Sequence, residues 1–180
     1  PGDVRNNMCY AWMMGAAKLG MHFVAMGPEE LAKQMDKDVV NSTFAEAREN
    51  GGLIEITDNK TDLKDADVIY GDVWASMGEE AQIPERVRLL SPFRVTEETL
   101  NATENPDVLY LHCLPADITG LSCPEGEVDN SVFDRYIVPL YKQASYKPYI
   151  IAAMMFLAQV KDPVRALMEM DKSGEERKMF

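Results

Sequence analysis

The feature that most constrains the fold of this chain is the alternation of short apolar runs with segments of helical periodicity. Apolar runs of strand length occur at 21–26 ("MHFVAM"), 53–57 ("LIEIT"), 67–73 ("DVIYGDV") and 108–113 ("VLYLHC"). Runs of this length separated by helical segments are typical of parallel strands joined by helical crossovers. The sequence therefore predicts an α/β fold: a three-layer α/β/α domain with a parallel Rossmann-like sheet covered on both faces.

The helices are predicted from apolar spacing and from residues typical of helix ends. Asn7 stands where it can cap a first helix that Gly20 closes. A second helix is expected to begin with Pro28 in its first turn and to run to about Asn50. Further helical segments are expected near 63, 79–90 and 96–103 and, as a buried apolar helix, from Pro148 through Val160, with a loop at 117–130.

Length, charge and hydropathy exclude several classes of protein. A chain of 180 residues suits one domain. Its formal net charge of -12 would repel a phosphate backbone, so nucleic acid is not an expected partner. The longest apolar stretch, Tyr149 to Ala158, is about half of the roughly 20 residues that span a bilayer, so no membrane partner is expected either.

The cysteines predict a reducing compartment. Cys9, Cys113 and Cys123 are odd in number and lack the spacing of a zinc site, so neither a disulfide framework nor a metal centre is expected. No signal peptide opens the chain as it stands, and the predicted location is the cytoplasm.

Three polar clusters follow, or lie beside, the predicted strand ends. They are Asp3 to Asn7, Asp72 to Gly78, and His112 to Pro115. Ligands of open parallel sheets bind outside the carboxyl ends of the strands. The three clusters are therefore expected to converge on one rim and to form a binding crevice.

Each cluster has a binding interpretation and a simpler structural one. Asp72 and Ser76 could bind an ammonium group, but the same residue types suit a turn cap and a helix cap. Asn7 and the backbone N–H groups of the helix that follows it could bind a carboxylate, whereas a simple N-cap explains the same residue. The residues alone do not choose between these interpretations.

The pair His112-Cys113 invites the hypothesis of a cysteine nucleophile. Neighbouring residues of a strand point to opposite faces, so the two side chains are not expected to share a proton. A buried structural cysteine explains Cys113 equally well. The Leu114-Pro115 bond that follows could be cis.

The order of the motifs is more specific than any one of them. "GDVRNN" and "GAAKLGM", then "ADVIYGDVWASMGEE", then "LHCLPA" with a later "GEV" resemble the second half of the aspartate/ornithine carbamoyltransferase family. The resemblance covers nearly the whole chain and, in these blocks, is closest to the ornithine enzymes. It implies that residues 1–180 are the amino-acid-binding domain, and that the carbamoyl-phosphate domain, with its S-T-R-T and H-P-T-Q segments, is absent from this chain.

The resemblance also implies a role for each site residue. Asn7 and the Met77 backbone would hold the amino-acid carboxylate, and Asp72 with Ser76 the α-ammonium. Cys113 and the Leu114 carbonyl would face the reacting amine and the carbamoyl group, and the Leu114-Pro115 bond would be cis. No cofactor or metal is implied. The full-length protein would be a homotrimer that transfers a carbamoyl group from carbamoyl phosphate to an amine such as ornithine, and this chain alone would be inactive.

The end of the chain departs from the ornithine enzymes. Their E-A-E-N-R-M-H segment aligns best with "QASYKPY", which places Lys147 where the family has the arginine on the carbamoyl-phosphate side. Lysine offers a point charge in place of a planar fork. The tail instead resembles the YgeW-type transcarbamylases, so the identity of the amine stays open. The aspartate branch fits less well, because it has H-P-L-P-R where this chain has "HCLPA".

Two other classes of protein are weighed against the transferase. A nucleotide-binding domain of an oxidoreductase predicts a glycine-rich first turn, and "GDVRNN" lacks that glycine pattern. A non-catalytic binding module would keep the fold without the phosphate half.

Overall fold

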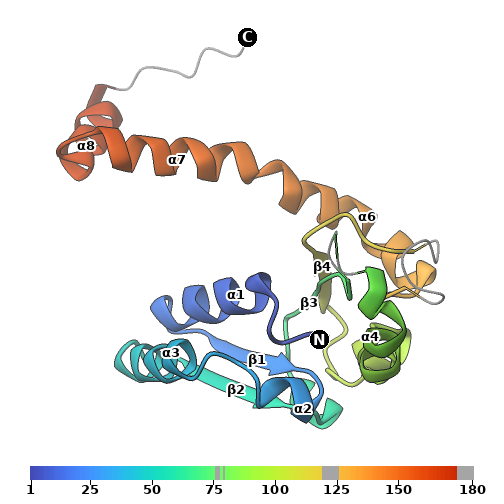
Figure 1. The fold of residues 1–180 in the computed structure, drawn as a ribbon. Helices are drawn as coiled ribbons and strands as arrows, with labels where there is room; N and C mark the ends of the chain where they lie inside the picture. Colours follow the sequence, from blue (N-terminus) through green and yellow to red (C-terminus); the bar gives the residue numbers. More distant parts are fainter. Residues whose placement is uncertain (76–77, 79, 119–125, 174–180) are drawn as a thin grey trace. The chain divides into compact units, whose positions relative to one another are not determined.

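The computed structural model describes residues 1–75, 78, 80–118 and 126–173. Within them helices alternate with strands, and every strand pairing is parallel (Figure 1). The chain divides into two compact units, residues 1–141 and 142–180, which are described separately. The predicted α/β class is confirmed.

The first strand pair carries two helices. β1 (His22–Met26) runs parallel to β2 (Leu53–Thr57), and α1 (Asn7–Lys18) and α3 (Lys37–Glu49) pack on each other and on this pair (Figure 1). Small side chains permit this close packing, because Ala16, Ala17 and Ala25 are all buried. The remaining buried residues of this core include Met13, Ile54 and Leu90.

The second strand pair holds the other core. β3 (Val68–Gly71) runs parallel to β4 (Leu109–His112), with Gly71 opposite His112. Buried side chains of η1 (Lys60–Leu63), α5 (Glu97–Asn101) and α6 (Asn130–Ser145) join those of the strands in one apolar cluster. Its fully buried members include Tyr110, Val128, Val132 and Leu140.

The strands form two two-stranded sheets, where the sequence predicted one continuous sheet. The segment Gly2 to Asn6 links the two pairs at their carboxyl ends. The Gly2 N–H donates to the Met26 carbonyl (2.9 Å), and the Asn6 side chain donates to the Val73 carbonyl (3.1 Å). Gly27 is required beside this segment, because a Cβ there would lie 2.3 Å from the Gly2 oxygen.

The prediction of a single helix from Pro28 to about Asn50 is wrong. This segment is divided into α2 (Glu29–Ala32) and α3. The side chain of Asp36 causes the new start, because it accepts hydrogen bonds from the N–H groups of Asp38 (2.9 Å) and Val39 (3.1 Å). The first helix also begins one residue differently, with Asn6 at the N-cap and Asn7 inside the helix.

Two later helical predictions are confirmed and one helix was missed. η2 (Glu80–Gln82) and α4 (Ile83–Leu90), followed by η3 (Ser91–Phe93), occupy the segment predicted at 79–90. α5 lies within the segment predicted at 96–103. The sequence did not predict α6, whose pattern contains Pro139 in the helix interior, a position that proline disfavours.

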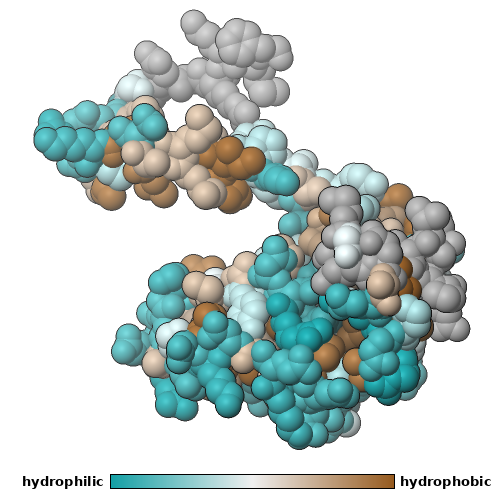
Figure 2. Space-filling view, viewed as in Figure 1, coloured by the Kyte–Doolittle hydropathy of each residue, from teal (hydrophilic) through white to brown (hydrophobic). Residues whose placement is uncertain are grey.

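The second unit contains the end of α6, α7 (Lys147–Gln159) and α8 (Pro163–Ser173). The helix predicted from Pro148 to Val160 is confirmed as α7, but its predicted burial is wrong, since none of its residues is buried. Figure 2 shows apolar side chains along this helix. The exposed large apolar residues of α7 include Ile150, Met154 and Leu157. No helix in the described part of the chain is long and apolar enough to cross a bilayer.

Candidate functional site

The carboxyl ends of β3 and β4 bring two of the predicted clusters together. Gly71 and His112 are paired in register, so the residues that follow them, Asp72 and Cys113, leave the sheet side by side. The Cys113 thiol donates to Asp72 Oδ1 at 2.9 Å. The third cluster joins them, because Asn6 Nδ2 donates to Asp72 Oδ2 at 3.1 Å. The predicted convergence of the three clusters on one rim is confirmed.

Asp72 is the centre of this rim. Its carboxylate accepts hydrogen bonds from the Asn6 amide, the Cys113 thiol and the backbone N–H of Val73 (2.8 Å). An ionised carboxylate has about four acceptor positions. The described donors occupy three of them, which leaves one position for an N–H group of a ligand. The bond to Val73 shows that Asp72 also has the turn-forming role that the sequence allowed.

Cys113 is a neutral thiol at physiological pH. Burial raises its pKa to about 12, and the hydrogen bond to Asp72 together with the charge of that carboxylate adds to the increase. Reactive cysteines need a lowered pKa, because the thiolate is the nucleophile. The geometry therefore makes Cys113 a hydrogen-bond donor and argues against nucleophilic catalysis.

The His112 side chain is fully buried. Its Nδ1 accepts a hydrogen bond from the backbone N–H of Leu114 at 2.9 Å, so the proton of a neutral ring lies on Nε2. Nε2 lies 3.3 Å from Glu127 Oε1, although the pair lacks the alignment of a hydrogen bond. A buried carboxylate thus faces the protonated side of the ring.

The distance between His112 and Cys113 differs from the prediction. Strand alternation predicted opposite faces, but Cys113 Sγ lies 3.9 Å from His112 Nδ1. The alternation fails because β4 ends at His112 and the chain turns at Leu114, which has a φ of 52°. The bond from Leu114 to His112 holds this turn, and the Leu114-Pro115 bond is cis, as the sequence suggested.

An aromatic pair that the sequence analysis missed borders the rim. The Trp12 and Tyr70 rings have centroids 5.0 Å apart. The pKa of Tyr70 is raised to about 12, mainly by burial. A hydrogen bond with Trp12 lowers this pKa, and electrostatic interactions with Cys113 and Asp72 raise it slightly. A signal for Tyr70 existed in the sequence, since it precedes Asp72 by two residues and alternation places both on one side of the strand.

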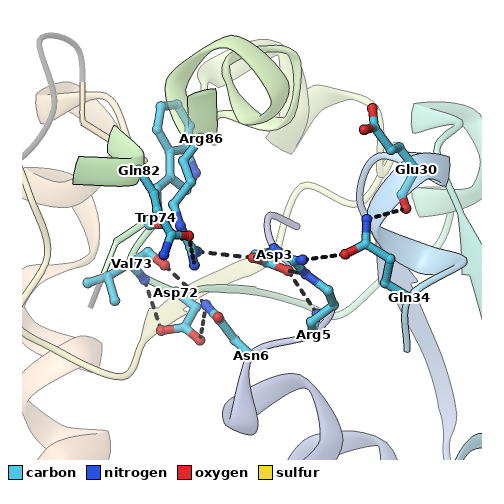
Figure 3. A network of polar contacts seen from close by, with 10 residues as sticks. All are labelled: Asp3, Arg5, Asn6, Glu30, Gln34, Asp72, Val73, Trp74, Gln82 and Arg86. Carbon is cyan, nitrogen blue, oxygen red and sulfur yellow. Dashed lines mark hydrogen bonds and ion pairs between the residues drawn. The ribbon is translucent and has the colours of Figure 1, made fainter. Parts of the chain in front are cut away.

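A network of charged side chains around the buried Asp3 lies beside Asp72 (Figure 3). Asp3 accepts hydrogen bonds from Arg5 Nε (3.0 Å) and Nη2 (2.8 Å), and from Arg86 Nη1 (3.1 Å). Burial alone would raise the pKa of Asp3, but the bonds from Arg5 and the charges of both arginines outweigh burial and lower it. The sequence placed Asp3 in a polar cluster but gave no signal for Arg86, which lies 83 residues away.

Residues 1–158 match the family model described as "Aspartate/ornithine carbamoyltransferase, Asp/Orn binding domain". The chain belongs to this family. The resemblance predicted from the motifs is thereby confirmed, and membership argues against the alternative of an oxidoreductase domain.

Individual proteins that are similar to this carbamoyltransferase-family chain support the same family. It is 41% identical over 169 residues to a catabolic ornithine carbamoyltransferase of Clostridium perfringens, covering 86% of this chain and 50% of that protein. The crystal structure of anabolic ornithine carbamoyltransferase from Campylobacter jejuni superposes with a TM-score of 0.76 at 28% identity, over 86% of this chain and 48% of that one. The Pyrococcus furiosus enzyme gives a TM-score of 0.63 at 37% identity, over 74% and 40%. The chain spans about half the length of the curated relatives it matches.

Some residues that the family resemblance nominates are not joined to the rim by described contacts. Ser76 and Met77 lie outside the described residues. Asn7 is exposed in the first turn of α1, and it is Asn6 that bonds to Asp72. Lys147 is exposed in the first turn of α7, within the second unit. The ligand roles of these four residues stay predictions.

Surface shape and metal ligands complete the description of the site. Two hollows of about 350 and 380 Å³ among the described residues lie elsewhere, beside Ile56 and beside Asn101, and neither is lined by Asp72 or Cys113. Among the same residues no group of three or more His, Cys, Asp or Glu side chains is placed to hold a metal ion. The site is therefore a polar rim supported by buried charges.

Proposed function

We propose that residues 1–180 form the amino-acid-binding domain of a carbamoyltransferase, in which an amine accepts a carbamoyl group from carbamoyl phosphate. The observation that carries this proposal is the position of Asp72, tied to Cys113 and Asn6 at the meeting of two strand ends and a helix start. Family membership supports the reaction class. Because the chain spans about half of its relatives, we assign carbamoyl phosphate to a separate domain.

The rim offers a position for each end of an amino acid. Three described donors reach the Asp72 carboxylate, and we assign its fourth acceptor position to an α-ammonium group. The start of α1, where Asn7 is exposed, suits an α-carboxylate because the helix dipole is positive there. Ser76 is assigned to the ammonium and the Met77 backbone to the carboxylate, both by family resemblance. Cys113 and the Leu114 carbonyl would then face the reacting amine.

The proposed reaction makes one bond and breaks one. The neutral amine nitrogen attacks the carbamoyl carbon, an N–C bond forms, and the C–O bond to phosphate breaks with its electron pair leaving on phosphate. The amine nitrogen loses one proton, and the released phosphate takes it up as hydrogen phosphate. The domain contributes orientation, and Asp72 with the neutral Cys113 thiol sets the charge around the amine before attack.

Ornithine is the first candidate for the amine, since relatives that are 41% and 47% identical to the chain are named ornithine carbamoyltransferases. A YgeW-type transcarbamylase with another amine is the second candidate, suggested by the tail and by Lys147. For the full-length protein we propose a homotrimer in the cytoplasm. The absence of a disulfide between Cys9 and Cys113 is consistent with that compartment.

Calorimetric titration of L-ornithine into the chain tests the binding site. We expect binding that Asp72→Asn weakens about tenfold or more, because a charge-assisted hydrogen bond contributes about 1.5–3 kcal/mol. The exposed acid substitution Glu85→Gln is the control and should leave affinity unchanged. Equal affinity in Asp72→Asn and the unmodified chain would contradict the proposed site.

A hybrid protein separates a catalytic domain from a binding module. The chain replaces the corresponding half of the Clostridium perfringens relative, and citrulline is measured after adding ornithine and carbamoyl phosphate. We expect citrulline from the hybrid, none from the hybrid with Asp72→Asn, and none from the 180-residue chain alone. A folded hybrid that binds ornithine without forming citrulline would favour the module.

A further inference from the structure

Arg86 lies at the junction of three segments of the site. It belongs to α4, and only 10% of its side chain is exposed. Its Nη1 donates both to Asp3 Oδ2 (3.1 Å) and to the carbonyl oxygen of Trp74 (2.9 Å). Its Nη2 also donates to Gln82 Oε1 (3.3 Å), one turn earlier along the chain. One planar group therefore joins a helix, the residues before α1 and the loop after β3 (Figure 3).

Neutralising Asp3 does not explain this arrangement. Arg5 already donates to that carboxylate through its backbone N–H (3.0 Å) and through Nε and Nη2. Among the described contacts, Arg86 donates to the Trp74 carbonyl of the loop after β3, and no described bond of Arg5 reaches that loop. Because a guanidinium is a rigid fork, it can hold a carboxylate and a carbonyl at a fixed separation.

The Trp74 carbonyl is two residues beyond Asp72, so this bond acts on the loop that carries the carboxylate. On the other side of the loop, Asn6 donates to Asp72 Oδ2 and to the Val73 carbonyl, both at 3.1 Å. The loop is thus held from the start of α1 by Asn6 and from α4 by Arg86. The Trp74 side chain, 1% exposed, anchors the same residue in the first core.

We propose that Arg86 is a positioning residue: by holding the Trp74 carbonyl against Asp3, it fixes the Asp72 carboxylate where that group meets Cys113 and an incoming amine. Arg86 reaches the ligand only through the loop. The part of this inference that concerns an amine rests on the proposed function, whereas the part that concerns Cys113 does not.

Three variants test the proposal. Arg86→Met removes the hydrogen bonds to Asp3, the Trp74 carbonyl and Gln82, but leaves Asp3 paired with Arg5, so the fold is expected to persist. Arg86→Lys keeps a charge without the fork and is expected to behave between Arg86→Met and the unmodified chain. Arg88→Met is the matched control, because Arg88 lies on the same helix and makes an exposed pair with Glu85.

The first measurement needs no ligand. Alkylation of each cysteine is followed by peptide mass spectrometry from pH 7 to pH 12, with thermal unfolding as the measure of folding. In Arg86→Met we expect the Cys113 midpoint to fall by about 1 pH unit or more, because a loosened Asp72 no longer stabilises the thiol. Arg88→Met should titrate like the unmodified chain. The second measurement is L-ornithine affinity, expected to weaken about tenfold in Arg86→Met and less in Arg86→Lys.

The outcomes distinguish the two proposals. A folded Arg86→Met variant with unchanged Cys113 titration overturns the positioning role. If Arg86→Met does not fold, Arg86→Lys is used instead, and a folded Arg86→Lys variant with unchanged Cys113 titration overturns the positioning role. If the unmodified chain binds no ornithine while Cys113 still shifts, the proposed function fails and the positioning role stands.

Discussion

Cys113 Sγ lies 2.9 Å from Asp72 Oδ1, and this hydrogen bond joins the carboxyl ends of β3 and β4. Burial, together with the hydrogen bond to the carboxylate and its charge, raises the pKa of the thiol and keeps it protonated. The thiol in turn occupies one acceptor position of the carboxylate.

The first prediction concerns Cys113 in the variant Asp72→Asn. The midpoint of Cys113 alkylation, expected at about pH 12 in the unmodified chain, should fall because the variant removes the charge and replaces one of the two acceptor oxygens with a donor. A neighbouring charge shifts a pKa by about 1–3 units, so an effect of that size is expected. Cys9 serves as the comparison and should shift less, since burial is the main reason that its pKa is raised to about 11 and the charge of Asp72 is the last of the causes. A Cys113 midpoint that stays at about pH 12 would show that burial alone is sufficient.

The second prediction concerns acid stability. The pKa of Asp3 is lowered from 3.8 in the folded protein, so its contribution to stability is present above that pH and is lost as pH falls through the lower folded value. Asp3→Asn should lower the free energy of unfolding at pH 7 by about 3 kcal/mol, because breaking a buried ion pair leaves charges unpaired. It should also flatten the loss of stability below about pH 4.

Urea unfolding between pH 7 and pH 3 measures both effects of Asp3→Asn. Glu85→Gln serves as the control, because Glu85 pairs with Arg88 at the surface and should change little. Parallel stability curves for Asp3→Asn and the unmodified chain would contradict the assignment.

The third prediction compares the stability effects of substituting two neighbouring tyrosines. Tyr110 and Tyr136 have ring centroids 6.3 Å apart, but only the Tyr136 hydroxyl has a partner among the described residues, the Val108 carbonyl at 2.7 Å. Tyr110→Phe should therefore raise the free energy of unfolding by about 1 kcal/mol, and Tyr136→Phe should lower it by about as much. Changes of the same sign in thermal or urea unfolding would contradict this account.

The fourth prediction concerns the close packing at Gly71. A Cβ at this position would lie 2.6 Å from the Tyr110 hydroxyl and 2.9 Å from His112 Cδ2. Gly71→Ala should destabilise the protein by about 1–3 kcal/mol through overpacking, and less in the background Tyr110→Phe, which removes the nearest atom. Gly15→Ala, where a Cβ meets nothing within 4 Å, is the matched control and should be neutral or stabilising. Additive effects of Gly71→Ala and Tyr110→Phe would show that the hydroxyl is not the obstacle.

Strand identity and the meeting of the polar clusters were predictable because both follow from local pattern. Apolar runs of strand length give β1 to β4, and the rule that ligands bind at strand carboxyl ends places Asp72 beside Cys113. The helix boundaries were less predictable, since a single side chain, Asp36, decides where α3 begins.

The supporting residues were not predictable, because their roles arise from contacts between distant segments. From its sequence position Arg86 is an ordinary residue of a predicted helix. Its contact with Asp3, 83 residues away, arises only from the tertiary fold. The hydrogen bond from Asn6 to Asp72 likewise joins residues 66 positions apart, whereas the sequence pointed to Asn7 as the site residue of this segment. A sequence pattern specifies neighbours along the chain, whereas these contacts are set by tertiary packing.

The two tryptophans of the chain have contrasting surroundings. Trp12 is 37% exposed and lies against Tyr70, whereas Trp74 is 1% exposed and its carbonyl is held by Arg86. Their emission should therefore contain a red-shifted, readily quenched component and a blue-shifted, protected one. Acrylamide quenching of tryptophan fluorescence can therefore report structural changes near the strand ends without an attached dye.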